Sequence, residues 1–216
     1  MSNKTEKTAK EAAPEQKAKK DIDPKVVMEL RGRTNAGMMD CKKALKEAGG
    51  NMEEAEKILR KKLNLSASKK ADRATSEGVI ASYIHMGGKV GVLIEVNCET
   101  DFVAKNDNFR DFVKDITLHI AAANPQYLIR EDVDPKLIEA EREVFAEQVK
   151  DKPANVIDKI VDGKVDKFYS TICLMEQPFI KDQNKTIQDV VNEKIGELGE
   201  NMQIRRFARY SVGEAI

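Results

Sequence analysis

The chain has 216 residues, with 37 basic and 37 acidic side chains, 41% hydrophobic residues and 5% aromatic residues. This length is enough for one or two domains with a modest core, and the neutral charge balance argues against a general nucleic-acid binder, which needs many Lys and Arg contacts to phosphate. No run approaches the roughly 20 apolar residues of a membrane span, and the amino terminus lacks the apolar core of a secretory signal, so we expect a soluble intracellular protein.

Residues 1–22 are expected to form a disordered tail, because they alternate Lys, Glu, Ala and Thr with almost no large apolar side chain. Helical structure is predicted to begin at Asp23-Pro24, an N-cap followed by proline at the first helical position. Two further helices follow, one ending at Gly49-Gly50 and one capped by Asn51. Residues 23–64 are therefore predicted to form a small three-helix domain, whose limited core favours a docking module or a unit that leans on a partner.

Residues 65–75 are predicted to be a linker, because they are rich in Ser, Ala, Lys and Asp without an apolar period. A period-two alternation from Val79 to Tyr83 then predicts the first arm of a hairpin that turns at Gly87-Gly88 and returns over residues 89–96. This change to a period-two pattern predicts a domain boundary, followed by a core domain over residues 76–216.

The rest of the core is predicted to be mostly helical and to end in a strand, which needs a neighbour because an unpaired edge invites association. The fold class is therefore α+β: a three-helix domain followed by an α/β core with an antiparallel hairpin and packed helices. The predicted elements are a helix over 108–123, a helix from Asp134-Pro135 to Val149, a stretch from Pro153 that Gly163 divides from a second helix over 165–174, an extended segment over 177–180, a helix capped by Thr186, and a strand over 201–212.

The sequence lacks the motifs of the common enzyme classes. Neither GxxxxGK[ST] nor GxGxxG occurs, and the nucleophile elbow GxSxG is also missing. No histidine or second carboxylate pair converges in sequence on Glu99 and Asp101. The cysteines and histidines are also too scattered for a zinc site or a disulfide framework, so we expect buried thiols, no metal, no cofactor and no enzymatic activity. These residues are Cys41, Cys98, Cys173, His85 and His119.

Two stretches stand out, and the residues alone leave two interpretations open for each. The first runs from Leu30 to Leu45 and contains Met38-Met39 at a helix start. Met39, together with Ala44 and Leu45, suggests the buried side of this helix, although flexible Met side chains also suit binding surfaces. The second runs from Glu95 to Asn106 and offers Phe102 where an apolar strand meets a helix. Phe102 is either a core aromatic or an exposed functional residue, since such connections commonly carry function.

Both stretches closely resemble the two signature regions of the elongation factor Ts family, whose members are nucleotide exchange factors for elongation factor Tu in translation. The resemblance extends from about Asp23 to Ile216. The sequence departs from the family at Asn35, where glycine is usual. Asn tolerates a left-handed backbone better than most residues, so we expect the turn to be kept.

The resemblance implies a division of labour between two sites. The three-helix domain, which is similar to ubiquitin-associated modules, would dock on the GTPase domain of elongation factor Tu. Arg31, Met38 and Met39 would make that first contact. A corner of Thr100, Asp101, Phe102 and Val103 would displace the partner's magnesium, with Phe102 as a wedge between helices of the GTPase and Asp101 helping to hold or polarise that rearrangement.

The resemblance also bears on assembly and location. Longer relatives carry two related copies of the core unit, so we expect a homodimer, with the strand over 201–212 contributing to the interface. We expect no direct binding to nucleic acid or membrane and a cytoplasmic location, with an organelle interior as the alternative. The alternative functions are a non-exchanging interaction adaptor and an RNA-binding translation protein.

Overall fold

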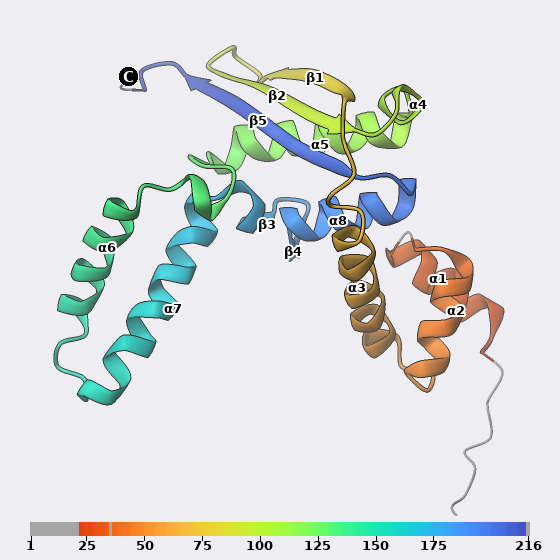
Figure 1. Ribbon diagram of the computed structural model, residues 1–216, viewed down its shortest axis with the longest axis horizontal. Helices are drawn as coiled ribbons and strands as arrows, with labels where there is room; N and C mark the ends of the chain where they lie inside the picture. Colours follow the sequence, from red (N-terminus) through yellow and green to blue (C-terminus); the bar gives the residue numbers. More distant parts are fainter. Residues whose placement is uncertain (1–21, 35, 215–216) are drawn as a thin grey trace, which may run out of the picture.

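The computed structural model describes residues 22–34 and 36–214, so the expected turn at Asn35 and nearly all of the expected tail lie outside the described residues. Helices and a small antiparallel sheet are combined, which confirms the α+β fold class (Figure 1). The elements are α1 (Pro24–Thr34), α2 (Met38–Glu47), α3 (Met52–Ser68), β1 (Glu77–Ile84), β2 (Val90–Cys98), α4 (Asp101–Ala104), α5 (Asp107–Ala123), η1 (Arg130–Asp132), α6 (Pro135–Gln148), α7 (Ala154–Ile172), η2 (Leu174–Glu176), β3 (Pro178–Phe179), β4 (Asp182–Thr186), α8 (Ile187–Leu198) and β5 (Met202–Ser211).

Helices α1, α2 and α3 pack around one small apolar cluster, centred on Leu30, Leu45 and Leu59, all buried. The end of α2 is fixed by Gly49, whose left-handed φ of +61° turns the chain so that the Gly50 N–H reaches the Leu45 carbonyl at 2.8 Å. The next helix begins at once, because the Asn51 side chain accepts a hydrogen bond from the Glu54 N–H at 3.1 Å. These local signals confirm the predicted helix ends.

Helix α3 continues beyond the predicted boundary at residue 64 and reaches Ser68, so the first residues of the expected linker 65–75 are helical. Ala67 is buried in the main core, which is formed by the sheet and its helices. The extension rests on α8: a Cβ atom added to Gly196 would lie 2.3 Å from Leu63 Cδ2, so glycine permits very close packing of the two helices. No local apolar period over residues 65–68 predicts the extension, because α8, the helix on which α3 packs, lies more than 100 residues later in the sequence.

Within the described residues, β1, β2 and β5 form an antiparallel sheet in the order β1-β2-β5. The predicted hairpin is confirmed, with Val92 opposite Tyr83, and β5 pairs with β2 over Val90–Cys98 with one irregularity next to Glu95. Helices α5 and α8 cover one face of the sheet (Figure 1). On that face, the main core is built around Ile94, Phe109 and Ile187, all fully or almost fully buried.

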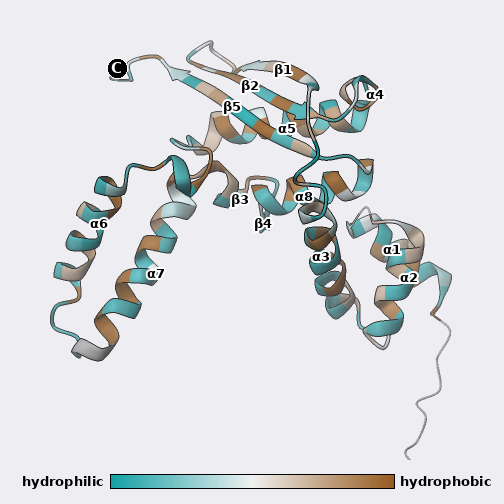
Figure 2. Ribbon diagram, viewed as in Figure 1, coloured by the Kyte–Doolittle hydropathy of each residue, from teal (hydrophilic) through white to brown (hydrophobic). Residues whose placement is uncertain are grey.

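Helices α6 and α7 form an antiparallel arm that extends from the core, at the left of Figure 1. Figure 2 shows hydrophobic and hydrophilic residues alternating along both helices, as expected for two amphipathic helices that pack on each other. The predicted break at Gly163 is wrong, because α7 runs through it without interruption. Glycine costs about 1 kcal/mol in a helix interior, and burial of Val161 and Val165 on either side offsets this cost.

The base of the arm is held by Arg130. Its guanidinium donates to Glu176 and, at 2.8 Å, to Asp166, and it lies 4.4 Å from the centre of the Tyr169 ring. Strand β4 is a polar segment that the sequence did not predict, and it pairs with β3, within the expected extended segment. The arm and the three-helix domain thus project from opposite ends of the same core (Figure 1).

Candidate partner-binding surfaces

The corner between β2 and α5 is a short, capped helix. Strand β2 ends at Cys98, which is buried, and Thr100 then adopts an extended conformation and caps α4. Its hydroxyl oxygen accepts a hydrogen bond from the Val103 N–H at 3.4 Å, and its carbonyl accepts from the Ala104 N–H at 3.2 Å. Asn106 then caps α5. The chain therefore turns from strand to helix through two successive caps.

This geometry separates the corner residues into an outer and an inner set. Phe102 is 81% exposed, although it is a large aromatic residue. Val103 is partly buried and packs against the main core, and Ala104 is buried within it. The core interpretation of Phe102 is therefore wrong. Val103 anchors the corner from inside, and Phe102 is the residue that the corner presents to solvent.

Asp101 is paired beside Phe102. Lys105, one helical turn later, donates to the Asp101 carboxylate at 2.6 Å. This hydrogen bond and the positive charge of the ammonium lower the pKa of Asp101. The corner therefore presents an aromatic ring next to a carboxylate that stays ionised at neutral pH.

The preceding residue, Glu99, anchors the root of the corner. Its carboxylate accepts from the Asn201 N–H and lies 3.4 Å from the Arg73 guanidinium. The Asn201 hydrogen bond, with a further contribution from Arg73, lowers the pKa of Glu99. Sequence reasoning considered Glu99 only as a catalytic acid and missed this anchoring role, because both partners are distant in the sequence.

The three-helix domain exposes the other predicted residues. Met38 and Met39 are 42% and 63% exposed at the start of α2, and Arg31 is exposed near the end of α1. The prediction that Met39 lies on the buried side is wrong, because Cys41 and Leu45 occupy that side. The two methionines expose an apolar surface at the start of α2, and Arg31 exposes a positive charge on the same three-helix domain. Exposed methionine and arginine side chains are typical of protein-binding surfaces.

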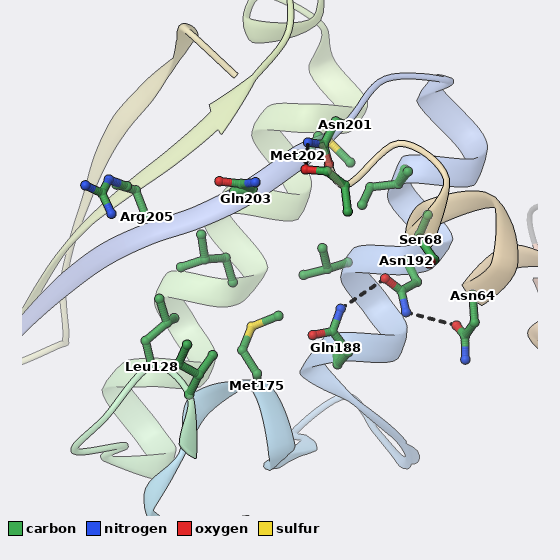
Figure 3. Close-up of a pocket in the computed structure, with 16 residues that line it drawn as sticks. Asn64, Ser68, Leu128, Met175, Gln188, Asn192, Asn201, Met202, Gln203 and Arg205 are labelled. Atoms are coloured by element: carbon green, nitrogen blue, oxygen red, sulfur yellow. Dashed lines mark hydrogen bonds between the residues drawn. The ribbon is translucent and has the colours of Figure 1, made fainter. Parts of the chain in front are cut away.

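A seam between α3 and α8 joins this surface to the core. Arg60 Nε donates to the Asp189 carboxylate at 3.0 Å, and Asn192 donates to the Asn64 side chain at 2.9 Å. Figure 3 shows the amide chain from Asn64 through Asn192 to Gln188 at the edge of a cavity of about 470 Å³ between α3, α8 and β5. The two exposed surfaces therefore belong to one connected framework.

The histidine and cysteine positions have structural explanations. His119 is fully buried; its Nδ1 accepts from the Ile180 N–H at 3.3 Å, so Nε2 carries the proton shared with Gln177 Oε1 at 2.9 Å. All three cysteines are buried and free, as predicted. In residues 22–34 and 36–214, no group of three or more Cys, His, Asp or Glu side chains is arranged to hold a metal ion. The helices of the same residues include none that is long and apolar enough to span a membrane.

Comparison with known proteins gives consistent matches. The family model for elongation factor TS matches residues 4–214. The elongation factor Ts of Alkaliphilus oremlandii is 56% identical over 198 residues, which cover 91% of each chain. The elongation factor Ts of Geobacter sulfurreducens is 58% identical over 192 residues, which cover 88% of this chain and 89% of the relative.

Proposed function

The chain belongs to the elongation factor Ts family, and from this premise we propose that it is a guanine nucleotide exchange factor for elongation factor Tu in translation elongation. It binds the GDP-bound GTPase, displaces magnesium from the GTPase and promotes release of GDP, so that GTP can bind. This role requires no covalent chemistry from the chain itself and no cofactor.

The exposed surface of the three-helix domain makes the first contact in this proposal. Met38 and Met39 lose solvent exposure on docking, and Arg31 on α1 supplies a positive charge from the same domain. Burying apolar side-chain area yields roughly 25 cal/mol per Å², so two half-exposed methionines contribute a modest part of the affinity. The rest of the affinity comes from a wider interface of more than about 1,000 Å².

The corner then loosens the nucleotide. The partner holds GDP through a phosphate cradle and through magnesium that bridges charged oxygens, so an exchange factor that disturbs the metal needs no contact with the base. Phe102 inserts between helices of the partner, and ionised Asp101 helps to hold the rearrangement. Full burial of Phe102 contributes about 1.5 to 3 kcal/mol. Thermodynamic linkage makes this effect reciprocal: bound nucleotide weakens binding of the exchange protein as many-fold as the exchange protein weakens binding of the nucleotide.

The exposure of Phe102 on a doubly capped corner is the single observation that carries this proposal, because a large apolar side chain is presented to solvent by a well-anchored backbone. The test is release of labelled GDP from elongation factor Tu. Wild type should accelerate release, and Phe102→Ala should lower the maximal rate by about 10-fold to 100-fold. Met86→Ala, which removes another exposed apolar side chain, is the matched control and should retain the wild-type rate. Failure of wild type to accelerate release would refute the exchange function.

A homodimer is part of the same proposal. The sheet face opposite α5 carries exposed apolar residues in register, because Leu93 lies next to Ala208, and Gly91 lies between Ile84 and Tyr210. An ion pair of 2.6 Å between Glu95 and Arg206 borders this face. A second copy related by a two-fold axis would cover it, with β5 contributing Tyr210.

Light scattering tests the dimer directly. Wild type should show twice the monomer mass at micromolar concentration, and Leu93→Glu should restore the monomer mass by placing a charge in the apolar face. Leu65→Glu changes a leucine on α3 that is at least as exposed as Leu93 and should leave the mass unchanged. A monomeric wild type over the whole micromolar range would contradict the proposal.

The two alternative functions make different predictions in the same exchange experiment. An adaptor built on a ubiquitin-associated-like domain would bind elongation factor Tu without accelerating GDP release, and an RNA-binding protein would bind RNA alone in a salt-sensitive manner. Exposed Phe102 favours exchange over the adaptor, because an adaptor built on the three-helix domain needs no aromatic residue on the core domain. The neutral charge balance counts against the RNA-binding alternative. A role in translation places the protein in the cytoplasm, or in an organelle interior with a bacterial-type translation system.

A further inference from the structure

The turn between α8 and β5 contacts the corner from behind. Helix α8 ends at Gly199, whose left-handed φ of +80° redirects the chain into Glu200 and Asn201. The Glu200 carboxylate accepts two hydrogen bonds from Thr100, one from the backbone N–H at 3.1 Å and one from the hydroxyl at 2.7 Å. Because both hydrogen bonds come from one residue, the carboxylate fixes the backbone position of Thr100 and the rotamer of its side chain.

This contact controls how Thr100 caps α4. A hydroxyl group has one hydrogen and two lone pairs. Because Glu200 takes the hydrogen, the Thr100 oxygen turns its lone pairs toward the Val103 N–H. Helix α4 has only four residues, too few to be stable by itself. The direction of Phe102, the second residue of α4, therefore depends on a cap that Glu200 orients.

The same turn also holds the segment that leads from the three-helix domain. Asn201 is only 2% exposed, and its side-chain amide donates to the Ala71 carbonyl at 3.2 Å and to the Arg73 carbonyl at 2.9 Å. Its backbone N–H donates to Glu99, one residue before Thr100. Figure 3 places Asn201 at the top of the cavity, near Ser68 at the end of α3. Two consecutive residues thus bind the corner on one side and the connecting segment on the other.

We propose that Glu200 is a positioning residue for nucleotide exchange, which acts by orienting the Thr100 cap so that Phe102 is presented in its productive direction. Asn201 fixes the corner relative to the connecting segment, and therefore relative to the docking helices. Neither residue needs to touch the partner. This inference rests on the proposed exchange function and deepens it, because it makes the corner one part of a unit that includes a turn 100 residues away in the sequence.

The experiment separates positioning from docking and from stability. GDP release from elongation factor Tu is measured over a range of exchange-factor concentrations, which gives a maximal rate and a half-saturating concentration. Glu200→Ala should lower the maximal rate by at least about 10-fold, because it removes both charge-assisted hydrogen bonds from Thr100, and should change the half-saturating concentration by less than about 2-fold. Glu197→Ala removes a carboxylate on α8 that pairs with Lys194 and not with the corner, and should leave both parameters unchanged.

A double-mutant cycle with Phe102→Ala identifies the route of the effect. If Glu200 acts through Phe102, then Glu200→Ala should have no further effect in the Phe102→Ala background. An equal loss in both backgrounds would overturn the inference. Should Glu200→Ala fail to fold, Thr100→Val removes the hydroxyl that Glu200 orients and carries the same expectation, whereas Thr100→Ser keeps that hydroxyl and should lower the maximal rate less than Thr100→Val does.

The outcomes distinguish this inference from the proposed function. Wild type that fails to accelerate release overturns the exchange function. Wild type that exchanges normally, together with Glu200→Ala or Thr100→Val that keeps the full maximal rate, overturns the positioning role alone. A fall in the maximal rate with an unchanged half-saturating concentration supports it.

Discussion

Asp189 links the cap of α8 to the three-helix domain, and its substitution should show how strongly the seam stabilises the protein. Its carboxylate accepts hydrogen bonds from the Thr186 N–H at 3.0 Å and the Thr186 hydroxyl at 2.8 Å. It also accepts from Arg60 on α3. Burial of Asp189 opposes ionisation, but the hydrogen bonds from Arg60 and Thr186 outweigh burial and lower the pKa of this carboxyl.

Asp189→Ala should lower the free energy of unfolding by about 2 to 3 kcal/mol. Loss of half of the capping box costs about 1 kcal/mol, and loss of a hydrogen bond to a charged partner costs about 1.5 to 3 kcal/mol when water is excluded. The second contribution is reduced here, because the Arg60 side chain is 46% exposed and regains water. Because the pKa of Asp189 is lowered in the folded state, this stabilisation is present above about pH 4 and is lost as the pH falls through the folded-state pKa.

Urea denaturation followed by circular dichroism measures the effect. The midpoint for Asp189→Ala should fall by about 1 M relative to wild type. Asp162→Ala is the matched control, because it removes an aspartate that pairs with an arginine at 2.7 Å, but with both side chains exposed on the arm. Its cost should stay below about 0.5 kcal/mol. Equal losses in the two variants, or a loss below about 1 kcal/mol in Asp189→Ala, would refute the reasoning.

Three further predictions concern single residues. Phe102→Ala should change the free energy of unfolding by less than about 0.5 kcal/mol in urea, because its ring is exposed; a loss above about 1 kcal/mol would contradict this surface position. Burial lowers the pKa of His119 from its ordinary value of 6.5, although the Gln177 hydrogen bond opposes the shift. The free energy of unfolding should therefore fall as the pH drops below about 6.5. His119→Gln should abolish this pH dependence in urea titrations above and below that pH. Arg130→Met should speed amide hydrogen exchange in α7 by about 10-fold and leave α5 unchanged; unaltered exchange in α7 would show that Arg130 does not hold the arm.

Much of the secondary structure could be predicted from the sequence, because the relevant interactions are local. Asn51 and Thr186 cap the helices that follow them within three residues, and Gly49 ends α2 through its positive φ. The alternation from Val79 to Tyr83 specified a strand with one partly buried face. Each of these signals acts between neighbours in the chain, so the order of residues is sufficient to reveal it.

The environment of the candidate site was decided only by tertiary structure. The same local pattern allowed Phe102 and Met39 to be either buried or exposed, and the choice depended on which side chains filled the two cores. The sequence alone predicts a helix break at Gly163, but burial of its neighbours Val161 and Val165 in the arm offsets the free-energy cost of glycine in a helix. Glu200 reaches Thr100 across 100 residues, and such a contact exists only after the sheet has formed, which is why no local pattern could reveal it.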